Sequence, residues 1–195
     1  MKTPISAAIV AAIVSTCGLS ISLQAANSPR TYKVLAPTAT APAGATYIEG
    51  YGRFALYGVD AATLDQMKAT SADVRADAEA DMLLFSAHPF DTQRGTLQAP
   101  APFSMRAADG PKLQVVQFVG PVKQKWLDEL AASGIKPVHY VANNGYIVWT
   151  DTQAQAQLAR MRSTHSWLQF SAPLYGFLKV DPTLTLRRSC REGIC

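Results

Sequence analysis

Cysteine and histidine are scarce in this chain of 195 residues, with three of each. Three cysteines are too few for a fold held together by disulfides, and three histidines leave little material for a metal centre. Charged residues make up only 16% against 48% hydrophobic residues, which excludes a disordered acidic or basic tail. The net charge of +4, from 18 basic and 14 acidic residues, excludes a dense phosphate-binding surface and therefore nucleic acid as a partner. We expect one ordinary domain or two very small ones.

Motifs of hydrolases, metal sites and nucleotide sites are also absent from the sequence. It contains no G-x-S-x-G elbow, no serine or histidine block of a subtilisin-like enzyme, no H-x-x-x-H pair, no C-x-x-C and no complete phosphate-binding glycine loop. None of the three histidines lies in a catalytic motif. Asp77, Glu79 and Asp81 alternate without the glycine and terminal glutamate of a calcium loop, which indicates a solvated acidic turn. We expect no catalytic residue, no metal and no cofactor, and hence a non-enzymatic protein.

The first 26 residues are typical of a secretory signal peptide. Met1-Lys2 is positively charged, residues 5–23 are mainly apolar, and Ala25-Ala26 offers small residues for cleavage. Serines and threonines dilute the apolar run and no basic stop-transfer cluster follows it, which disfavours a membrane anchor. We therefore expect a secreted or periplasmic protein without stable membrane insertion once the signal is removed.

The expected mature chain keeps two cysteines, Cys190 and Cys195, both within the last six residues. In an oxidising compartment, a disulfide between them is the natural interpretation. Two unpaired thiols at a frayed chain end are an equally good interpretation. In either case the fold does not depend on a disulfide.

Composition divides the first half of the mature chain into three segments. Residues 27–46 are rich in Pro, Ala and Thr and are predicted to be a flexible lead-in. Residues 47–90 are predicted to form a small α+β block of the order strand, helix, strand, strand, in which Asp60 caps the helix. Its elements are expected at residues 53–57, 61–68, 73–76 and 81–85. Residues 91–112 contain several Pro and Gly and are predicted to be a linker or a long surface loop.

Residues 113–180 carry clearer signals. Pro121 suits the first position of a helix, Gly134 suits its end, and Asn144-Gly145 is the strongest hairpin signal in the chain. Asp151 or Thr152 can cap a second helix. The expected strands are 113–119, 138–141, 146–149 and 167–170, with a further extended segment at 174–178, and the expected helices are 121–133 and 152–161. Residues 181–195 are expected to be a C-terminal tail.

The resulting order, strand, helix, strand, strand, helix, strand, predicts an α+β fold of the ferredoxin-like split βαβ type. In this fold two helices cover one face of a four-stranded antiparallel sheet. The other face is then bare and becomes a candidate docking surface, because exposed apolar patches mark interaction sites. Most of five aromatic residues are expected in the core, and any that lie on the bare face would mark it as a docking surface; the five are Trp126, Tyr140, Tyr146, Trp149 and Trp167.

Several segments resemble a known family. They are residues 116–121, 126–127, 134, 139–141, 144–149 and 173–180, preceded by the shorter segments 51–54 and 89–91. Together they resemble the N-terminal propeptide-like region of secreted bacterial subtilisin-like serine peptidases. The resemblance implies a split βαβ unit that packs its open sheet face on the protease, assists protease folding and blocks the active site until cleavage. The protease domain does not follow, so we expect a free-standing inhibitor-like protein or the truncated first part of a protease precursor.

The same resemblance places a docking segment directly after the last strand. This segment would add backbone hydrogen bonds in the substrate cleft of a subtilisin-like protease, as a strand-addition peptide does. The residues expected to take part are Lys179, Val180, Asp181, Pro182, Thr183 and Leu184. The alternative is a secreted structural or ligand-binding module that shares the fold and has no protease partner, because fold does not fix function.

Overall fold

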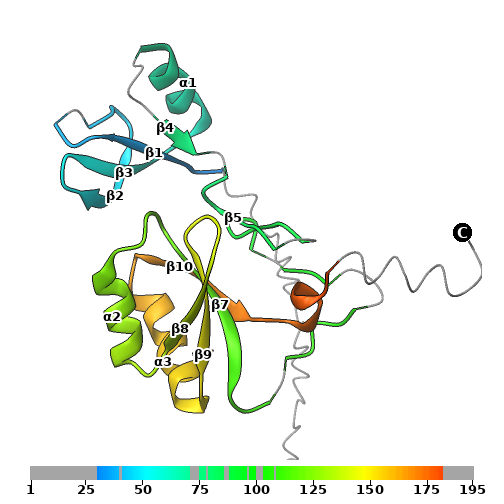
Figure 1. Cartoon of the computed structure of the whole chain (residues 1–195). Helices are drawn as coiled ribbons and strands as arrows, with labels where there is room; N and C mark the ends of the chain where they lie inside the picture. Colours follow the sequence, from blue (N-terminus) through cyan, green and yellow to red (C-terminus); the bar gives the residue numbers. More distant parts are fainter. Residues whose placement is uncertain are drawn as a thin grey trace, which may run out of the picture.

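A computed structural model describes residues 30–181, apart from residues 40, 71–74, 78, 86–87, 96, 100–102 and 108. Within these residues the chain has a mixed α+β fold with three antiparallel sheets and three α-helices (Figure 1). None of the helices in this part is long and apolar enough to cross a membrane. The expected signal peptide lies outside the described residues.

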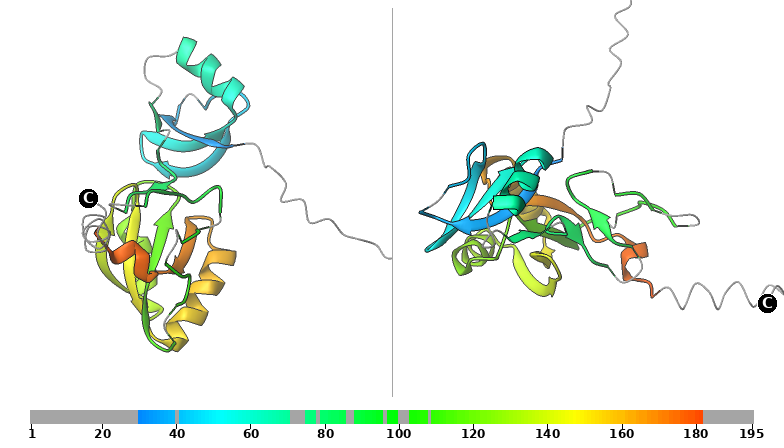
Figure 2. Two further views of the ribbon diagram at one scale, coloured as in Figure 1. Left: turned by 90° about the vertical axis from the view of Figure 1, so that its right-hand side faces the viewer. Right: turned by 90° about the horizontal axis from the view of Figure 1, so that it is seen from above.

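The first sheet has four strands in the order β2-β3-β1-β4. Its elements are β1 (Tyr32–Pro37), β2 (Thr46–Tyr51), β3 (Phe54–Val59), α1 (Ala61–Thr70) and β4 (Arg75–Asp77). Helix α1 begins as predicted, since the Asp60 carboxylate accepts a hydrogen bond from the Thr63 N–H at 2.7 Å. Leu64 and Met67 of α1 pack against Val34 of β1, and α1 lies on the side of this sheet away from the rest of the molecule (Figures 1 and 2).

The prediction for the first half missed two strands. The predicted lead-in, residues 27–46, contains β1, which pairs with both β3 and β4 inside the sheet. In the block 47–90 the predicted strand, helix, strand and strand are present in that order as β3, α1, β4 and β5, but β2 before them was not predicted. The Pro- and Ala-rich composition hid β1, because Val34 and Ala36 are buried by β3 and α1, which follow about twenty or more residues later in the chain.

The second sheet has the order β10-β7-β9-β8, with every neighbouring pair antiparallel. Its strands are β7 (Lys112–Phe118), β8 (Lys136–Val141), β9 (Gly145–Thr150) and β10 (Leu168–Pro173). The helices are α2 (Gln124–Ala132), between β7 and β8, and α3 (Thr152–Thr164), between β9 and β10. The predicted order of these six elements is confirmed.

Both helices pack on one face of this sheet. Trp126 of α2 is fully buried beside Phe118 of β7 and Trp167, and the ring centroids of all three pairs are 5.7 Å apart. Leu130 of α2 and Leu158 of α3 belong to the same core.

Local details differ from the prediction at two connections. Helix α2 begins at Gln124, so Pro121 precedes the helix and does not open it. In the β8–β9 hairpin the residues with positive φ are Asn143 and Asn144, both at 64°, and not Gly145. Gly145 is required for space, because a Cβ there would lie 2.5 Å from Cδ2 of Leu83.

The second face of the β10-β7-β9-β8 sheet is partly covered by the chain itself. The hairpin of β5 (Met82–Leu83) and β6 (Phe90–Asp91) packs Leu83, Phe85 and Phe90 against Val115 of β7 and Phe170 of β10. Hence the prediction of a bare second face is wrong over these two strands. The sequence carries only a weak signal for this hairpin, because each of its strands is only two residues long.

The C-terminal part of the described chain adds to this cover. Residues 176–179, predicted to be extended, form a short 3-10 helix, η1 (Gly176–Lys179). Its Phe177 and Leu178 pack against Leu113 and Ile147, together with Leu97, Ala99 and Phe103 from the predicted linker. Part of the predicted linker is therefore packed against the sheet instead of merely connecting two blocks.

Candidate functional site

The three histidines lie on different elements and serve packing or surface roles. The ring centroid of His88 lies 5.3 Å from that of Phe177, and the ring centroid of His165 lies 5.1 Å from that of Trp167. His139 is exposed on β8. Among the described residues no group of three His, Cys, Asp or Glu is arranged to hold a metal ion.

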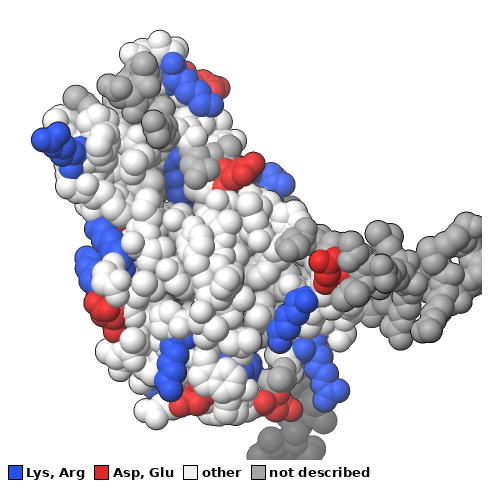
Figure 3. All heavy atoms as spheres, in the orientation of Figure 1, with Lys and Arg blue, Asp and Glu red and all other residues white. Residues whose placement is uncertain are grey.

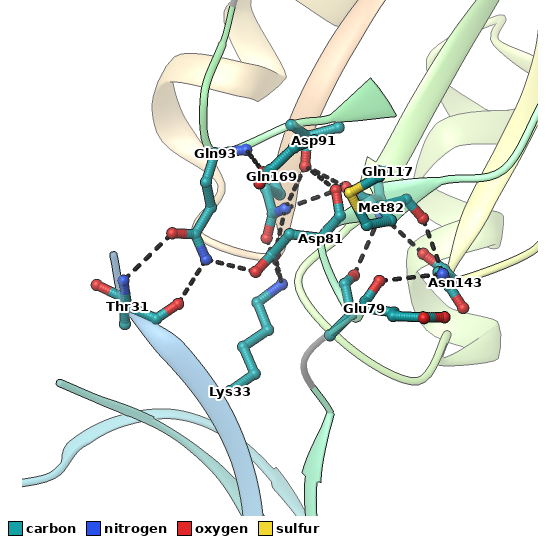
Figure 4. A network of polar contacts seen from close by, with 12 residues as sticks. Thr31, Lys33, Glu79, Asp81, Met82, Asp91, Gln93, Gln117, Asn143 and Gln169 are labelled. Carbon is teal, nitrogen blue, oxygen red and sulfur yellow. Dashed lines mark hydrogen bonds and ion pairs between the residues drawn. The ribbon is translucent and has the colours of Figure 1, made fainter. Parts of the chain in front are cut away.

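The largest group of interacting polar side chains lies where the two four-stranded sheets and the β5–β6 hairpin meet (Figure 4). We call it the Asp81 cluster; its members are Lys33, Asp81, Thr92, Gln93, Gln117, Asn143 and Gln169. At its centre the Lys33 Nζ lies 2.7 Å from Asp81 Oδ1, and the two side chains are only 5% and 4% exposed. The sequence-based interpretation of Asp81 as part of a solvated acidic turn is therefore wrong.

Amide side chains complete the hydrogen bonding of this ion pair. Gln169 of β10 donates to Asp81 Oδ1 at 2.8 Å, and Gln93 donates to Asp81 Oδ2. Lys33 also donates to the side-chain oxygen of Gln169. Both carboxylate oxygens and the ammonium group therefore have partners, which a buried ion pair needs to offset its loss of hydration.

Further hydrogen bonds tie the cluster to the second sheet. Gln117 of β7 donates to the carbonyls of Ala80 at 3.2 Å and Asn143 at 2.9 Å. Asn143 in turn donates to the carbonyls of Glu79 and Met82 at 3.0 and 2.9 Å. The Asp81 cluster thus fixes the base of the β5–β6 hairpin to β1, β7, β10 and the β8–β9 turn.

The chemistry of the Asp81 cluster suits a structural role. Its one positive and one negative charge cancel, and its central atoms are buried and hydrogen-bonded. A nucleophile needs an adjacent base and an open position for a substrate, and Thr92 has only amide and carbonyl partners. No sequence motif marks this group, because its members are brought together from segments as far apart in the chain as Asp81 and Gln169.

A second lysine also connects the two halves, but it comes from the second half and reaches the first sheet. Lys123, just before α2, lies 2.7 Å from Glu49 of β2, donates to the Gly50 carbonyl, and sits 4.7 Å above the ring of Tyr51. Burial opposes ionisation of Glu49, but the hydrogen bond and charge of Lys123 and the Gly50 N–H lower its pKa below the usual value. Burial also raises the pKa of Tyr51.

Glu49→Gln is expected to lower the free energy of unfolding by about 1 kcal/mol at neutral pH, because it removes a partly buried ion pair. Because the folded-state pKa of Glu49 is lowered, this stabilisation is complete above the unfolded-state pKa of about 4.3 and is lost as the pH falls through the folded-state value. Urea titrations between pH 7 and pH 3 measure the difference. A difference in unfolding free energy between the unaltered chain and Glu49→Gln that grows toward pH 3 contradicts the prediction. Asp65→Asn is the control, because Asp65 is exposed on α1.

The side of the second sheet next to its β8 edge is not covered. Val138 is 59% exposed, Tyr140 51% and Trp149 39%, so Tyr140 and Trp149 are the two of the five named aromatic residues that lie outside the core. With exposed His139 they form what we call the β8 edge patch, which spans both faces of the sheet at this edge. Tyr140 meets Tyr146 on the side of the two helices, whereas Trp149 points to the same face as Ile147, the second face. Figure 3 shows this side of the molecule as a broad uncharged surface over β8 and β9, with Lys, Arg, Asp and Glu around its margins.

Strand addition at this edge is hindered. Pro137 has no backbone N–H, and the register of β8 against β9 shifts between Pro137 and His139, which leaves Val138 in a bulge. Lys136 adds a charge at the start of the strand. A partner is thus expected to contact the side chains of the β8 edge patch and not to extend the sheet.

The segment predicted to dock in a protease is only partly described. Lys179 ends η1 and is exposed, Val180 is half-buried, and Asp181 is exposed. Pro182, Thr183 and Leu184 lie outside the described residues, as do Cys190 and Cys195. The described start of the segment leaves from the second face of the sheet, because η1 packs on Leu113 and Ile147.

Residues 67–171 match the family model described as "Domain of unknown function (DUF8729)". The matched segment is 105 of the 195 residues, more than half of the chain. The chain belongs to this family. Searches of curated proteins and of solved structures each found no significant match.

The family segment holds most, but not all, of the Asp81 cluster. It begins within α1 and ends within β10, and it includes Asp81, Gln117 and Gln169. The positive charge that pairs with Asp81 comes from Lys33 of β1, which lies before the segment. In this chain the family segment therefore depends on the first sheet for a buried counter-charge.

Proposed function

We propose that this chain is a secreted, non-catalytic, propeptide-like protein that binds a subtilisin-like serine protease and acts as its inhibitor, its folding assistant or both. The protease is a separate protein or the catalytic part of a longer precursor. The proposal combines the family resemblance of residues 116–149 and 173–180 with the arrangement of the second sheet.

The proposal includes the ferredoxin-like split βαβ fold for residues 112–173. It is supported by the strand order β10-β7-β9-β8 and by the two crossovers. Helix α2 connects β7 and β8, which lie on either side of β9, and α3 connects β9 and β10, which lie on either side of β7. In each of these two βαβ units, one further strand lies between the two connected strands. The ferredoxin-like fold has two such units, with both helices on one face of the sheet.

The direction in which the chain leaves the second sheet is the observation that carries the proposed function. After β10 the chain crosses to the face opposite α2 and α3, packs Phe177 and Leu178 of η1 there, and continues through Lys179. A protein docked on this side would meet the outgoing segment together with Trp149 of the β8 edge patch, because Trp149 lies opposite Leu113, which contacts η1. An extended segment beside a docking face is the arrangement that peptide-like inhibition of a protease needs.

Adding the purified chain to a subtilisin-like protease tests the proposal. We expect slower hydrolysis of a chromogenic peptide, faster recovery of active protease after dilution from denaturant, or both. A chain that changes neither rate contradicts the proposal. Recovery of a cell-envelope component in place of a protease would favour the alternative of a structural or ligand-binding module.

Trp149→Asp is expected to weaken inhibition about tenfold or more, because docking would bury a new unpaired charge at the β8 edge patch. Tyr47→Asp is the matched control, since Tyr47 is 60% exposed on β2 of the other sheet and lies outside the patch. Equal loss of inhibition in both variants would contradict a docking site at this edge.

A further inference from the structure

We propose that the β5–β6 hairpin is an autoinhibitory strap that covers part of the protease-docking face and swings away from it when the protease binds. The strap comprises residues 80–85 and 88–93, of which Asp81, Thr92 and Gln93 belong to its fixed base and the described residues 83–85 and 88–90 to the part that swings. This inference rests on the proposed function, because the face in question is the second face of the β10-β7-β9-β8 sheet.

The strap is a separate layer in the fold. Strands β5 and β6 pair only with each other and form a two-stranded sheet of their own. Lifting the strap therefore breaks no backbone ladder of either four-stranded sheet. Local opening of this kind loses the apolar contacts of the strap but few backbone hydrogen bonds, so it can occur without unfolding of either sheet.

Side chains alone attach the middle of the strap to the sheet. Leu83, Phe85 and Phe90 pack on Val115 and Phe170, with the Phe90 and Phe170 ring centroids 5.2 Å apart. The core on the opposite side of the sheet, around Trp126 and Leu130, includes no strap residue. The sheet with its two helices thus keeps that core when the strap is lifted.

The base of the strap is held far more firmly than its middle. Asp81 is fixed by Lys33 and Gln169, and the Thr92 N–H donates to the Asp81 carbonyl at 2.9 Å. Because both ends of the hairpin are tied to the Asp81 cluster, the strap has a fixed pivot. Figure 4 shows this base, where Asp81 and Gln93 face Lys33 and Thr31 of the first sheet.

Lifting the strap would expose apolar surface that a protease can use. Val115 is 1% exposed and Phe170 5% exposed beneath it, and both are adjacent to the face reached by η1. With the strap in place Val115 and Phe170 are hidden, whereas a chain with the strap lifted offers a larger apolar face. The strap would in this way weaken binding until a partner with a matching apolar surface displaces it.

Native-state hydrogen exchange on the purified chain tests opening directly. We expect the amides of Leu83 and Phe90 to exchange faster than those of β7 and β9. Leu83→Ala is expected to accelerate the strap amides alone by about 30-fold, since it removes a fully buried anchor. Leu130→Ala is the matched control, an equally buried leucine on the helix side. Strap amides that exchange together with those of β7 and β9 would overturn the inference.

Inhibition of a subtilisin-like protease by the same variants tests competition. Leu83→Ala is expected to inhibit more tightly than the unaltered chain, and Leu130→Ala no more tightly. Unchanged inhibition by Leu83→Ala, with a strap that opens in exchange, would show that the strap does not compete. If neither the unaltered chain nor Leu83→Ala affects hydrolysis or refolding, the proposed protease function is wrong, and so is the autoinhibitory role. Whether the strap opens is decided separately by the hydrogen-exchange data.

Discussion

Lys33→Met is expected to lower the free energy of unfolding by about 3–5 kcal/mol, because it leaves the buried Asp81 carboxylate without its counter-charge. Asp81 is 3% exposed, and the amides of Gln93 and Gln169 that remain carry no net charge. Equilibrium unfolding in urea at pH 7 measures the loss. The effect reaches beyond β1, since Asp81 also fixes the base of the β5–β6 hairpin on the second sheet.

The double variant Lys33→Met/Asp81→Asn separates loss of the charge pair from loss of packing. A neutral amide in place of the Asp81 carboxylate no longer needs a cation, so we expect the double variant to recover about 2 kcal/mol relative to Lys33→Met. If the losses of unfolding free energy in Lys33→Met and Asp81→Asn simply add up in the double variant, the attraction between the two charges contributes nothing. The loss in Lys33→Met would then come from the other contacts of the buried Lys33 side chain.

Trp126→Ala is expected to cost about 3–5 kcal/mol, because it empties the centre of the core between the second sheet and its helices. Trp126 is completely buried and stacks on both Phe118 and Trp167. No other described side chain joins the sheet and α2 through two aromatic stacks. Thermal or urea unfolding, followed by circular dichroism, measures this loss.

Trp126→Phe is the informative control for this position. The Nε1–H of Trp126 has no hydrogen-bond partner among the described residues, so a smaller ring loses packing but no hydrogen bond. We expect a loss of less than about half that of Trp126→Ala. A loss as large as that of alanine would indicate that Nε1–H is satisfied in solution, for instance by an ordered water.

The second half of the chain was predictable because its signals are local. The carboxylate of Asp151 caps α3 at 2.8 Å, Gly134 has φ +78° after α2, and β7 and β9 are rich in β-branched and aromatic residues. Each signal acts within a few residues of the backbone it shapes. The order of the six elements follows from these signals without knowledge of any long-range contact.

The first half was harder to predict because its strands depend on distant partners. Strand β1 has few residues typical of strands, yet it lies between β3 and β4 and supplies Lys33 to the Asp81 cluster. In the sequence, Asp77, Glu79 and Asp81 alternate as acidic residues do in a solvent-exposed turn. Only the position of β1 decides that this carboxylate is buried.

By itself, the sequence determined the α+β class, the order of the elements after Lys112 and the two helices on one face of the sheet. Tertiary structure alone decided that the other face is partly covered by the β5–β6 hairpin and η1, and that Asp81 is buried against Lys33. The physical reason is range: caps, turns and periodicity act between neighbouring residues, whereas burial of a face or a charge depends on segments that meet only after folding.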